Sequence, residues 1–238
     1  MSFKKFLKES FFPRSFTCDA CGIETFDNNL CPACLEKTVF NNKIFCPICG
    51  RKTFRREICI ECKSNPPLFE GAVSPFVYEG TIVTLIHKFK NGEPYLKEYF
   101  ADMIVGKFSE LSPFDYITFV PMTKKAERKR GYNQAKLLAE SISERVNIPV
   151  VDVVKKVKET PAQKTLSIRE RAKNLENCFK QQNGLPLLDK NVLLVDDVLT
   201  TGATAEAISL KLFKTGATRV FLATIASVEY KPNKKPVT

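Results

Sequence analysis

Two adjacent carboxylates, Asp196 and Asp197, stand between an apolar run and a loop rich in threonine. The run before them, residues 192–195, has the composition of a buried parallel strand. The segment TTGAT (200–204) follows and opens a helical pattern over about 205–214. Free N–H groups at a helix start, the helix dipole and threonine hydroxyls together form a cup for a phosphate group. The carboxylates one step upstream suit the vicinal hydroxyls of a ribose.

The string NVLLVDDVLTTGAT (191–204) resembles the signature of type I phosphoribosyltransferases, which use phosphoribosyl diphosphate (PRPP). An ordinary strand-to-helix turn, with Thr200 or Thr201 as the N-cap and solvated carboxylates, is the alternative. A glycine and three threonines where backbone must approach an anion favour the PRPP interpretation. The resemblance implies that Asp196 and Asp197 hold the ribose hydroxyls. It implies that the 5′-phosphate is held by Thr200, Thr201, Gly202, Ala203 and Thr204.

Eight of the nine cysteines fall in four C-x-x-C pairs within the first 62 residues. They repeat as CDACG, eight residues, CPAC and then, 28 positions later, CPICG, eight residues, CIEC. We predict two structural zinc ions, because a segment so poor in apolar residues needs a metal to fold. Redox chemistry is disfavoured because no βαβ pattern surrounds the pairs. The simplest ligand sets are Cys18, Cys21, Cys31, Cys34 and Cys46, Cys49, Cys59, Cys62; an interleaved pairing stays open.

Composition and charge exclude several classes of protein. The chain has 238 residues and is 44% hydrophobic, which suits a globular core domain with a small companion. No apolar run approaches twenty residues, and the N-terminal segment lacks the apolar region of a signal peptide. We therefore expect a cytoplasmic protein with reduced thiols and no membrane insertion. Eight thiolates and two zinc ions would lower the formal net charge from +11 to about +7.

The expected fold class is α/β, with a type I phosphoribosyltransferase-like parallel sheet flanked by helices and a small N-terminal double zinc ribbon. We expect the zinc ribbon over residues 1–66, the phosphoribosyltransferase-like domain over 67–228 and a disordered tail over 229–238. Besides the strand at 192–195, the patterns predict strands at 72–78, 116–120, 150–154 and 219–227, and helices at 82–90, 95–108 and 133–145.

A basic segment, residues 124–130, follows the strand expected at 116–120 and carries five basic residues and one acid. Such a run is often only a solvated helix face. Its place at the carboxyl end of a strand, where open α/β sheets bind ligands, favours a basic loop that contacts a diphosphate or a DNA backbone. The charged segment 155–179, interrupted by Pro161, is a candidate lid. The cations assigned to diphosphate or DNA are Lys124, Lys125, Arg128 and Arg130.

Two further motifs extend the resemblance beyond the PRPP signature. The string RGYNQAKLLA (130–139) resembles the ComF family pattern R-G-[FY]-N-Q-x-x-x-L-A, which is matched by Arg130, Gly131, Tyr132, Asn133, Gln134, Leu138 and Ala139. A block Q-x-x-L, then R-x-x-N and an aromatic, is matched by Gln163, Leu166, Arg171, Asn174 and Phe179. With the zinc ribbons and the PRPP signature, these motifs cover nearly the whole chain in the family's order. A family lysine near the first helix aligns ambiguously with Lys88 or Lys90, so neither is assigned as a ligand.

The resemblance implies a role in DNA uptake during natural transformation, with single-stranded DNA and a ComFA-like DNA-translocating ATPase as partners. It also implies binding of PRPP, or a related phosphorylated ligand, with Mg²⁺ between diphosphate and ribose. An active phosphoribosyltransferase with a nucleobase or amine acceptor is one alternative. A zinc-ribbon interaction module with a non-catalytic fold is another. No residue identifies an acceptor or a catalytic group, so turnover stays undecided by the sequence.

Overall fold

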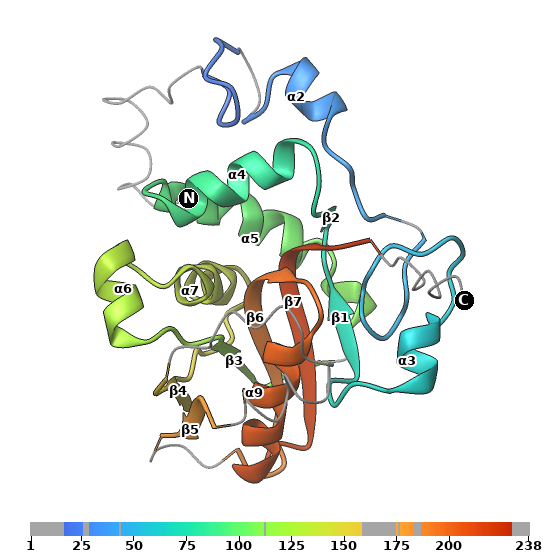
Figure 1. Cartoon of the computed structure of the whole chain (residues 1–238), viewed down its shortest axis with the longest axis vertical. Helices are drawn as coiled ribbons and strands as arrows, with labels where there is room; N and C mark the ends of the chain where they lie inside the picture. The colour runs from blue at the N-terminus through green and yellow to red at the C-terminus, as the bar shows by residue number, and fades with distance from the viewer. Residues whose placement is uncertain are drawn as a thin grey trace, which may run out of the picture.

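The central sheet is built around its two longest strands, β6 (Asn191–Leu199) and β7 (Arg219–Ser227), which pair in parallel. A computed structural model describes residues 17–25, 29–42, 44–111, 113–158, 175, 177–182 and 187–229. β3 (Tyr116–Phe119) pairs with β6, while β1 (Gly71–Val73) and β2 (Phe76–Val77) pair with β7. All these pairings are parallel, and the order is β1-β7-β6-β3 (Figure 1). Neighbours that are distant in sequence require crossovers through helices, which confirms the predicted α/β class.

Helices cover both faces of this sheet. α4 (Thr81–Lys90), α5 (Lys97–Val105) and α7 (Gln134–Val146) pack in one apolar cluster with Leu193 and Val195 of β6. α9 (Ala203–Lys214) packs in the other cluster with Val192 and Leu194. The residues of β6 alternate between the two clusters because successive side chains of a strand point to opposite faces of the sheet. The apolar run 192–195 is therefore fully buried on both sides, as its composition predicts.

Several predicted boundaries need correction. The strand expected at 72–78 is divided into β1 and β2 at Ser74 and Pro75, because proline has no N–H for the ladder. The helix expected at 95–108 is a helical series, η1 (Pro94–Leu96), α5 and η2 (Phe108–Glu110). The basic segment expected as a loop is the helix α6 (Lys124–Arg130), whose Thr123 hydroxyl accepts from the N–H of Ala126 at 3.2 Å.

The region after β3 departs further from the expected pattern. Val150 makes only an isolated parallel bridge to Ile117, so the strand expected at 150–154 does not form as such. Instead β4 (Val154–Lys156) pairs antiparallel with β5 (Phe179–Gln181). Most of the candidate lid, including Pro161 and four residues of the second family block, lies outside the described residues, as does the expected tail after residue 229. None of the described helices has the length and apolar composition needed to cross a membrane.

Two cysteine-rich segments lie at the periphery of the sheet (Figure 1). The first ribbon carries Cys18 to Cys34 and contains α2 (Pro32–Glu36); the second carries Cys46 to Cys62 and contains α3 (Ile60–Ser64). Buried residues of the first ribbon join the apolar cluster of α4 and α5. The four cysteines of the second join the cluster of β6 and α9. The two ribbons thus contact different parts of the α/β domain.

Candidate phosphate-binding site and zinc centres

Residues 200–204, the candidate phosphate-binding segment that we name the phosphate loop, lead from the end of β6 directly into α9. Gly202 is the N-cap of α9 and has a φ of 84°, in the left-handed region that favours glycine. No side chain caps the helix at Gly202. The hydroxyl of Thr201 accepts from the N–H of Ala203 at the long distance of 3.4 Å. Since α9 begins at Ala203, two residues before the expected start, the N–H groups of Ala203 and Thr204 belong to its first turn and suit an anion.

The two carboxylates belong to the end of β6 rather than to a loop. β6 was expected to end at residue 195, but it continues to Leu199, with Asp196 opposite Thr224 of β7. The Asp196 carboxylate accepts from the N–H of Asp197 at 2.8 Å. Burial, and after it the adjacent Asp197 carboxylate, raise the pKa of Asp196 to about 8, although Lys90 and Lys156 act in the opposite direction. Asp196 is therefore largely protonated at neutral pH when no ligand is bound.

Lys90 is a site residue that the sequence leaves ambiguous with Lys88. Its Nζ lies 2.7 Å from Oδ2 of Asp197, while Nζ of Lys88 lies 3.5 Å from Oε1 of Glu93. The family motif residue Tyr132 holds this end of α4, because its hydroxyl donates to the carbonyl of Phe89 at 2.5 Å. Only the packing of α4 on the sheet decides which lysine reaches the acid pair.

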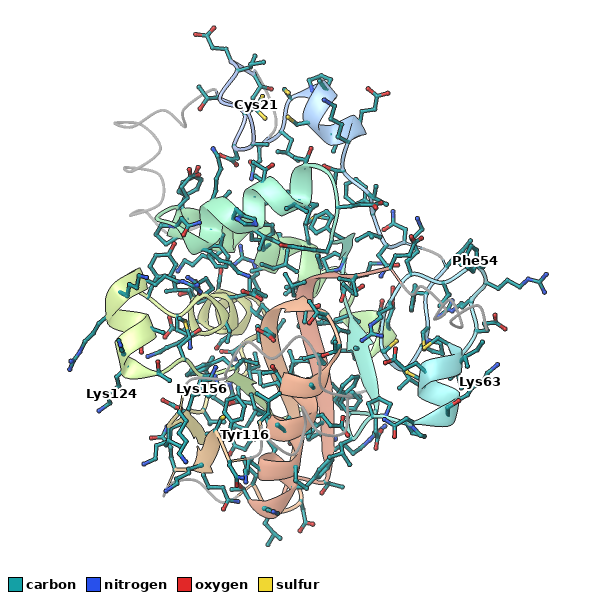
Figure 2. The ribbon with its side chains drawn as sticks, in the orientation of Figure 1. Cys21, Phe54, Lys63, Tyr116, Lys124 and Lys156 are labelled. Atoms are coloured by element: carbon teal, nitrogen blue, oxygen red, sulfur yellow. The ribbon has the colours of Figure 1, made fainter. Side chains whose placement is uncertain are left out.

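A cavity of about 640 Å³ lies at the carboxyl end of β3, between α6 and β4. Its walls combine apolar side chains such as Met122 and Val154 with basic ones. Figure 2 shows Lys124 and Lys156 on the same side of the molecule, from α6 and β4. The lysines that line the cavity are Lys124, Lys125, Lys136, Lys155 and Lys156.

The four predicted cations of the basic segment are thus divided. Lys124 and Lys125 line the cavity, and Arg128 is exposed on α6 without lining it. Arg130 donates from Nη1 to Oε1 of Gln134 at 2.8 Å, which joins α6 to α7. Asn133 accepts from the N–H of Lys136 at 3.3 Å and caps α7. Part of the RGYNQ string therefore supports the fold around the site.

The eight ribbon cysteines form two groups of four, and within each group the sulfur atoms all lie within 4.8 Å of one another. The distance is 3.7 Å between the sulfurs of Cys21 and Cys31 and 3.8 Å between those of Cys49 and Cys59. A tetrahedral site with Zn–S bonds of about 2.3 Å requires sulfurs about 3.8 Å apart. Both groups therefore fit zinc. Their members are Cys18, Cys21, Cys31, Cys34 and Cys46, Cys49, Cys59, Cys62, which excludes the interleaved pairing.

Two of these thiols hold their protons more tightly than a free cysteine does. Burial raises the pKa of Cys34 to about 12, and hydrogen bonding to Cys46 raises the pKa of Cys49 to about 12. Four thiolates at such short distances repel one another. A divalent metal at the centre of each group offsets that repulsion and binds the deprotonated sulfurs.

Known protein families match both parts of the chain. The family described as "Phosphoribosyl transferase domain" matches residues 131–237, and the family described as "Double zinc ribbon domain" matches residues 7–63. The fold and the site thus define a protein with a type I phosphoribosyltransferase fold and an N-terminal double zinc ribbon.

Three curated relatives are similar to the chain. The "Competence protein F" of Haemophilus influenzae is 30% identical over 223 residues, covering 87% of this chain and 94% of the relative. The "DNA utilization protein YhgH" of Escherichia coli is 28% identical over 67% of this chain and 73% of its own length. "Competence protein ComFC" of Bacillus subtilis is 29% identical over 55% of this chain and 53% of its own length. The chain belongs to the ComF family.

Proposed function

We propose that this ComF-family protein binds PRPP with Mg²⁺ at the carboxyl end of β6 and handles single-stranded DNA during DNA uptake. The observation that carries the PRPP proposal is the acid pair, Asp196 and Asp197, directly upstream of the uncapped start of α9. The competence and DNA-utilization names of the relatives support the DNA role. The proposal includes a ComFA-like ATPase as partner, a cytoplasmic location and the domain limits 1–66, 67–228 and 229–238.

In this proposal the two ends of the sugar meet different groups. Asp196 and Asp197 accept hydrogen bonds from the ribose hydroxyls, and the N–H groups of residues 200–204 donate to the 5′-phosphate. Once Asp196 is ionised, the two adjacent carboxylates supply oxygen ligands that suit Mg²⁺. When bound, Mg²⁺ would neutralise the diphosphate, and Asp196 and Asp197 would hold it beside the ribose. Lys90 would then be shared between Asp197 and the ligand.

Phosphoribosyl transfer to an unidentified nucleobase or amine is a second candidate function. The cavity of about 640 Å³ supports it, because Lys156 lines that cavity and also lowers the pKa of Asp196. Basic walls would stabilise a departing diphosphate, and apolar walls would contact an acceptor. Diphosphate release from PRPP, measured against a panel of bases and amines with and without single-stranded DNA, tests this candidate. A non-catalytic interaction module would bind no PRPP.

The PRPP site is tested by calorimetric titration of the full chain with PRPP and Mg²⁺. We expect micromolar to millimolar affinity and no detectable binding after Asp196→Ala combined with Asp197→Ala, because the ribose hydroxyls and Mg²⁺ lose their ligands. Asp102→Ala is the control, since it removes an exposed carboxylate of α5 away from the loop. Equal affinity in the double variant would remove the site from this position.

DNA contact is tested by the salt dependence of single-stranded DNA binding. We expect log affinity to fall with log salt at roughly −0.7 for each phosphate neutralised. Neutralising the predicted cations should reduce both the affinity and this slope. A flat salt response, or an unchanged affinity in the variant, would place DNA contact elsewhere. The variant combines substitutions of Lys124, Lys125, Arg128 and Arg130.

A further inference from the structure

Arg51, which follows the second zinc knuckle directly, is a buried arginine that the proposed site does not use. It is 7% exposed, although arginine rarely lies inside a protein without partners. The knuckle that carries it is packed against the sheet, since a Cβ on Gly50 would lie 2.6 Å from the carbonyl oxygen of Ala72 in β1. The carbonyl of Arg51 accepts from the N–H of the zinc-site residue Cys46 at 2.9 Å. Arg51 is therefore held close to both the second zinc centre and the sheet.

The guanidinium of Arg51 joins the second ribbon to the phosphate loop. Its Nη2 donates to the carbonyl of Thr200 at 2.6 Å, and its Nη1 donates to Oε2 of Glu61 at 2.5 Å. Glu61 lies in α3, between the zinc-site cysteines Cys59 and Cys62. Thr200 is the first residue of the phosphate loop. One planar side chain thus connects the zinc-bearing helix to the loop proposed to bind phosphate.

The bond to Thr200 also determines the direction of a loop amide. In a trans peptide the carbonyl and the following N–H point in opposite directions, and the described residues contain no cis peptide. With the carbonyl of Thr200 turned toward Arg51, the N–H of Thr201 faces the opposite side. Loss of Arg51 would free this peptide unit to rotate, and Thr201 would then donate less effectively to an anion.

A cavity of about 170 Å³ lies at this junction, lined by residues of both partners. Arg51, Glu61 and Cys62 come from the second ribbon, and Thr201, Gly202 and Glu206 come from the loop and the start of α9. The Nε atom of Arg51 is buried without a hydrogen-bond partner in the described structure. Glu206 accepts from the N–H of Leu68, just after the ribbon, at 3.1 Å. Arg51 thus contacts the phosphate loop itself, and the segment just after the ribbon contacts the first turns of α9.

We propose that Arg51 is a positioning residue for the 5′-phosphate and that the second zinc ribbon is a working part of the phosphate site. The proposal rests on the proposed PRPP function and deepens it. The zinc centre holds α3 and the knuckle; these hold Arg51, and Arg51 orients the peptide between Thr200 and Thr201. The ligand group that this site recognises is a phosphate monoester on a sugar. Its binding depends on whether zinc occupies the second ribbon, although that ribbon does not contact the ligand.

The test compares two probes in the full zinc-loaded protein. Ribose 5-phosphate carries the 5′-phosphate, and diphosphate with Mg²⁺ carries only the other end of PRPP. We expect Arg51→Met to weaken the binding of ribose 5-phosphate and of PRPP by about tenfold or more, because a charge-assisted hydrogen bond that orients the loop is lost. Binding of diphosphate with Mg²⁺ should stay within twofold of wild type. A general loss of structure would weaken the binding of both probes alike.

Two further variants keep the result interpretable. Arg51→Lys retains the charge but not the planar fork, so we expect a loss smaller than that of Arg51→Met. Arg145→Met is the control, because Arg145 of α7 also joins two elements, through Asp102 and Glu98 of α5, but away from the phosphate loop. Arg145→Met should leave the affinities for both probes unchanged. Zinc content and the melting temperature of each variant show whether it is folded.

The outcomes separate this proposal from the one on which it rests. If the wild-type protein binds neither PRPP nor ribose 5-phosphate, the proposed function fails. If the wild-type protein binds them and folded Arg51→Met binds them equally well, Arg51 does not position the loop and this inference is overturned. An equal loss of ribose 5-phosphate and of diphosphate with Mg²⁺ would also overturn it, because the effect would then be one of general stability.

Discussion

The two zinc ribbons share one cysteine pattern but differ in what surrounds them. All four cysteines of the second ribbon are buried, whereas in the first Cys21 is exposed and Cys34 only partly buried. The knuckle glycines occupy equivalent places and both have positive φ, 76° at Gly22 and 67° at Gly50. A Cβ on Gly22 would meet nothing within 4 Å, while one on Gly50 would collide with Ala72. The same module is therefore peripheral in one copy and embedded in the other.

The contacts of the ribbons with the α/β domain differ as well. The first ribbon holds the start of α4, where the hydroxyl of Thr81 donates to the carbonyl of Cys34 at 2.7 Å. The opposite end of α4 carries Lys90 to the acid pair, so the described residues of the first ribbon connect to the site through a helix. The second ribbon contacts Thr200 directly through Arg51. What a repeated metal module contributes thus depends on the surface it packs against.

The largest expected effect comes from removing one zinc ion at a time. Cys34→Ser and Cys62→Ser alter equivalent ligands, and each should reduce the zinc content from two ions to one. Because structural zinc contributes much of the folding free energy of such a segment, the affected ribbon should lose its structure. We expect Cys62→Ser to weaken PRPP binding by about a hundredfold or more and Cys34→Ser by less than about tenfold. Metal analysis and calorimetry measure both; equal affinities would contradict the comparison.

A pair of glycine substitutions measures the difference in packing. Gly22→Ala should cost about 1–2 kcal/mol, which is the penalty of a left-handed residue with a Cβ. Gly50→Ala should cost about 1–3 kcal/mol more, because its Cβ would force the knuckle away from β1. Denaturant unfolding of the zinc-loaded protein gives the two free energies. A cost for Gly22→Ala as large as that for Gly50→Ala would mean that the ribbons are equally embedded.

Asp196, the first carboxylate of the acid pair, should titrate in the neutral range. The pKa of Asp196 is raised to about 8 in the folded protein, so between about pH 4 and 8 it is protonated when folded and ionised when unfolded. Ligand-free stability should therefore fall as pH rises through this window. Binding of PRPP with Mg²⁺ needs the ionised carboxylate and should strengthen by up to about tenfold per pH unit until pH 8.

Calorimetry between pH 6 and 9 measures this dependence, with Asp196→Asn as the control. The groups around Asp196 are Asp197, Lys90 and Lys156, and the last two oppose the rise in its pKa. Asp196→Asn should bind weakly at every pH and lose the slope. A slope that persists in Asp196→Asn would assign the titration to another group.

The smallest expected effect tests the indirect route through α4. Tyr132→Phe removes the hydroxyl that donates to Phe89 and accepts from the N–H of Gly92, a loss of about 1 kcal/mol. With the end of α4 less firmly held, Lys90 should be placed less accurately beside Asp197, and the affinity for PRPP should fall a few-fold. Tyr95→Phe is the control, because its hydroxyl contacts Asp19 of the first ribbon instead. Calorimetry showing no change in Tyr132→Phe would mean that this bond does not position Lys90.

Local patterns predicted the elements that depend on neighbours within a few residues. The run 192–195 is a buried strand, the pattern after residue 204 is a helix, and the cysteine spacing defines the two ligand sets as the simplest pairing had them. These features depend on side-chain period, helix capping and the reach of a metal ligand. The local patterns were less accurate where pairing between strands sets the boundary of an element, as in the extension of β6 through Asp196 and the formation of β4 opposite β5.

Only the tertiary structure decided which residues meet around the acid pair and the phosphate loop. Lys90 and Lys88 are two positions apart on one helix, and the packing of α4 brings Lys90 to Asp197. Arg51 and Thr200 are 149 positions apart in the chain, so no local pattern connects them. The residue types of the proposed phosphate, ribose and zinc sites are encoded in short windows because their chemistry is local. Which distant residue supports them depends on how helices and ribbons pack against the sheet, which no window of sequence contains.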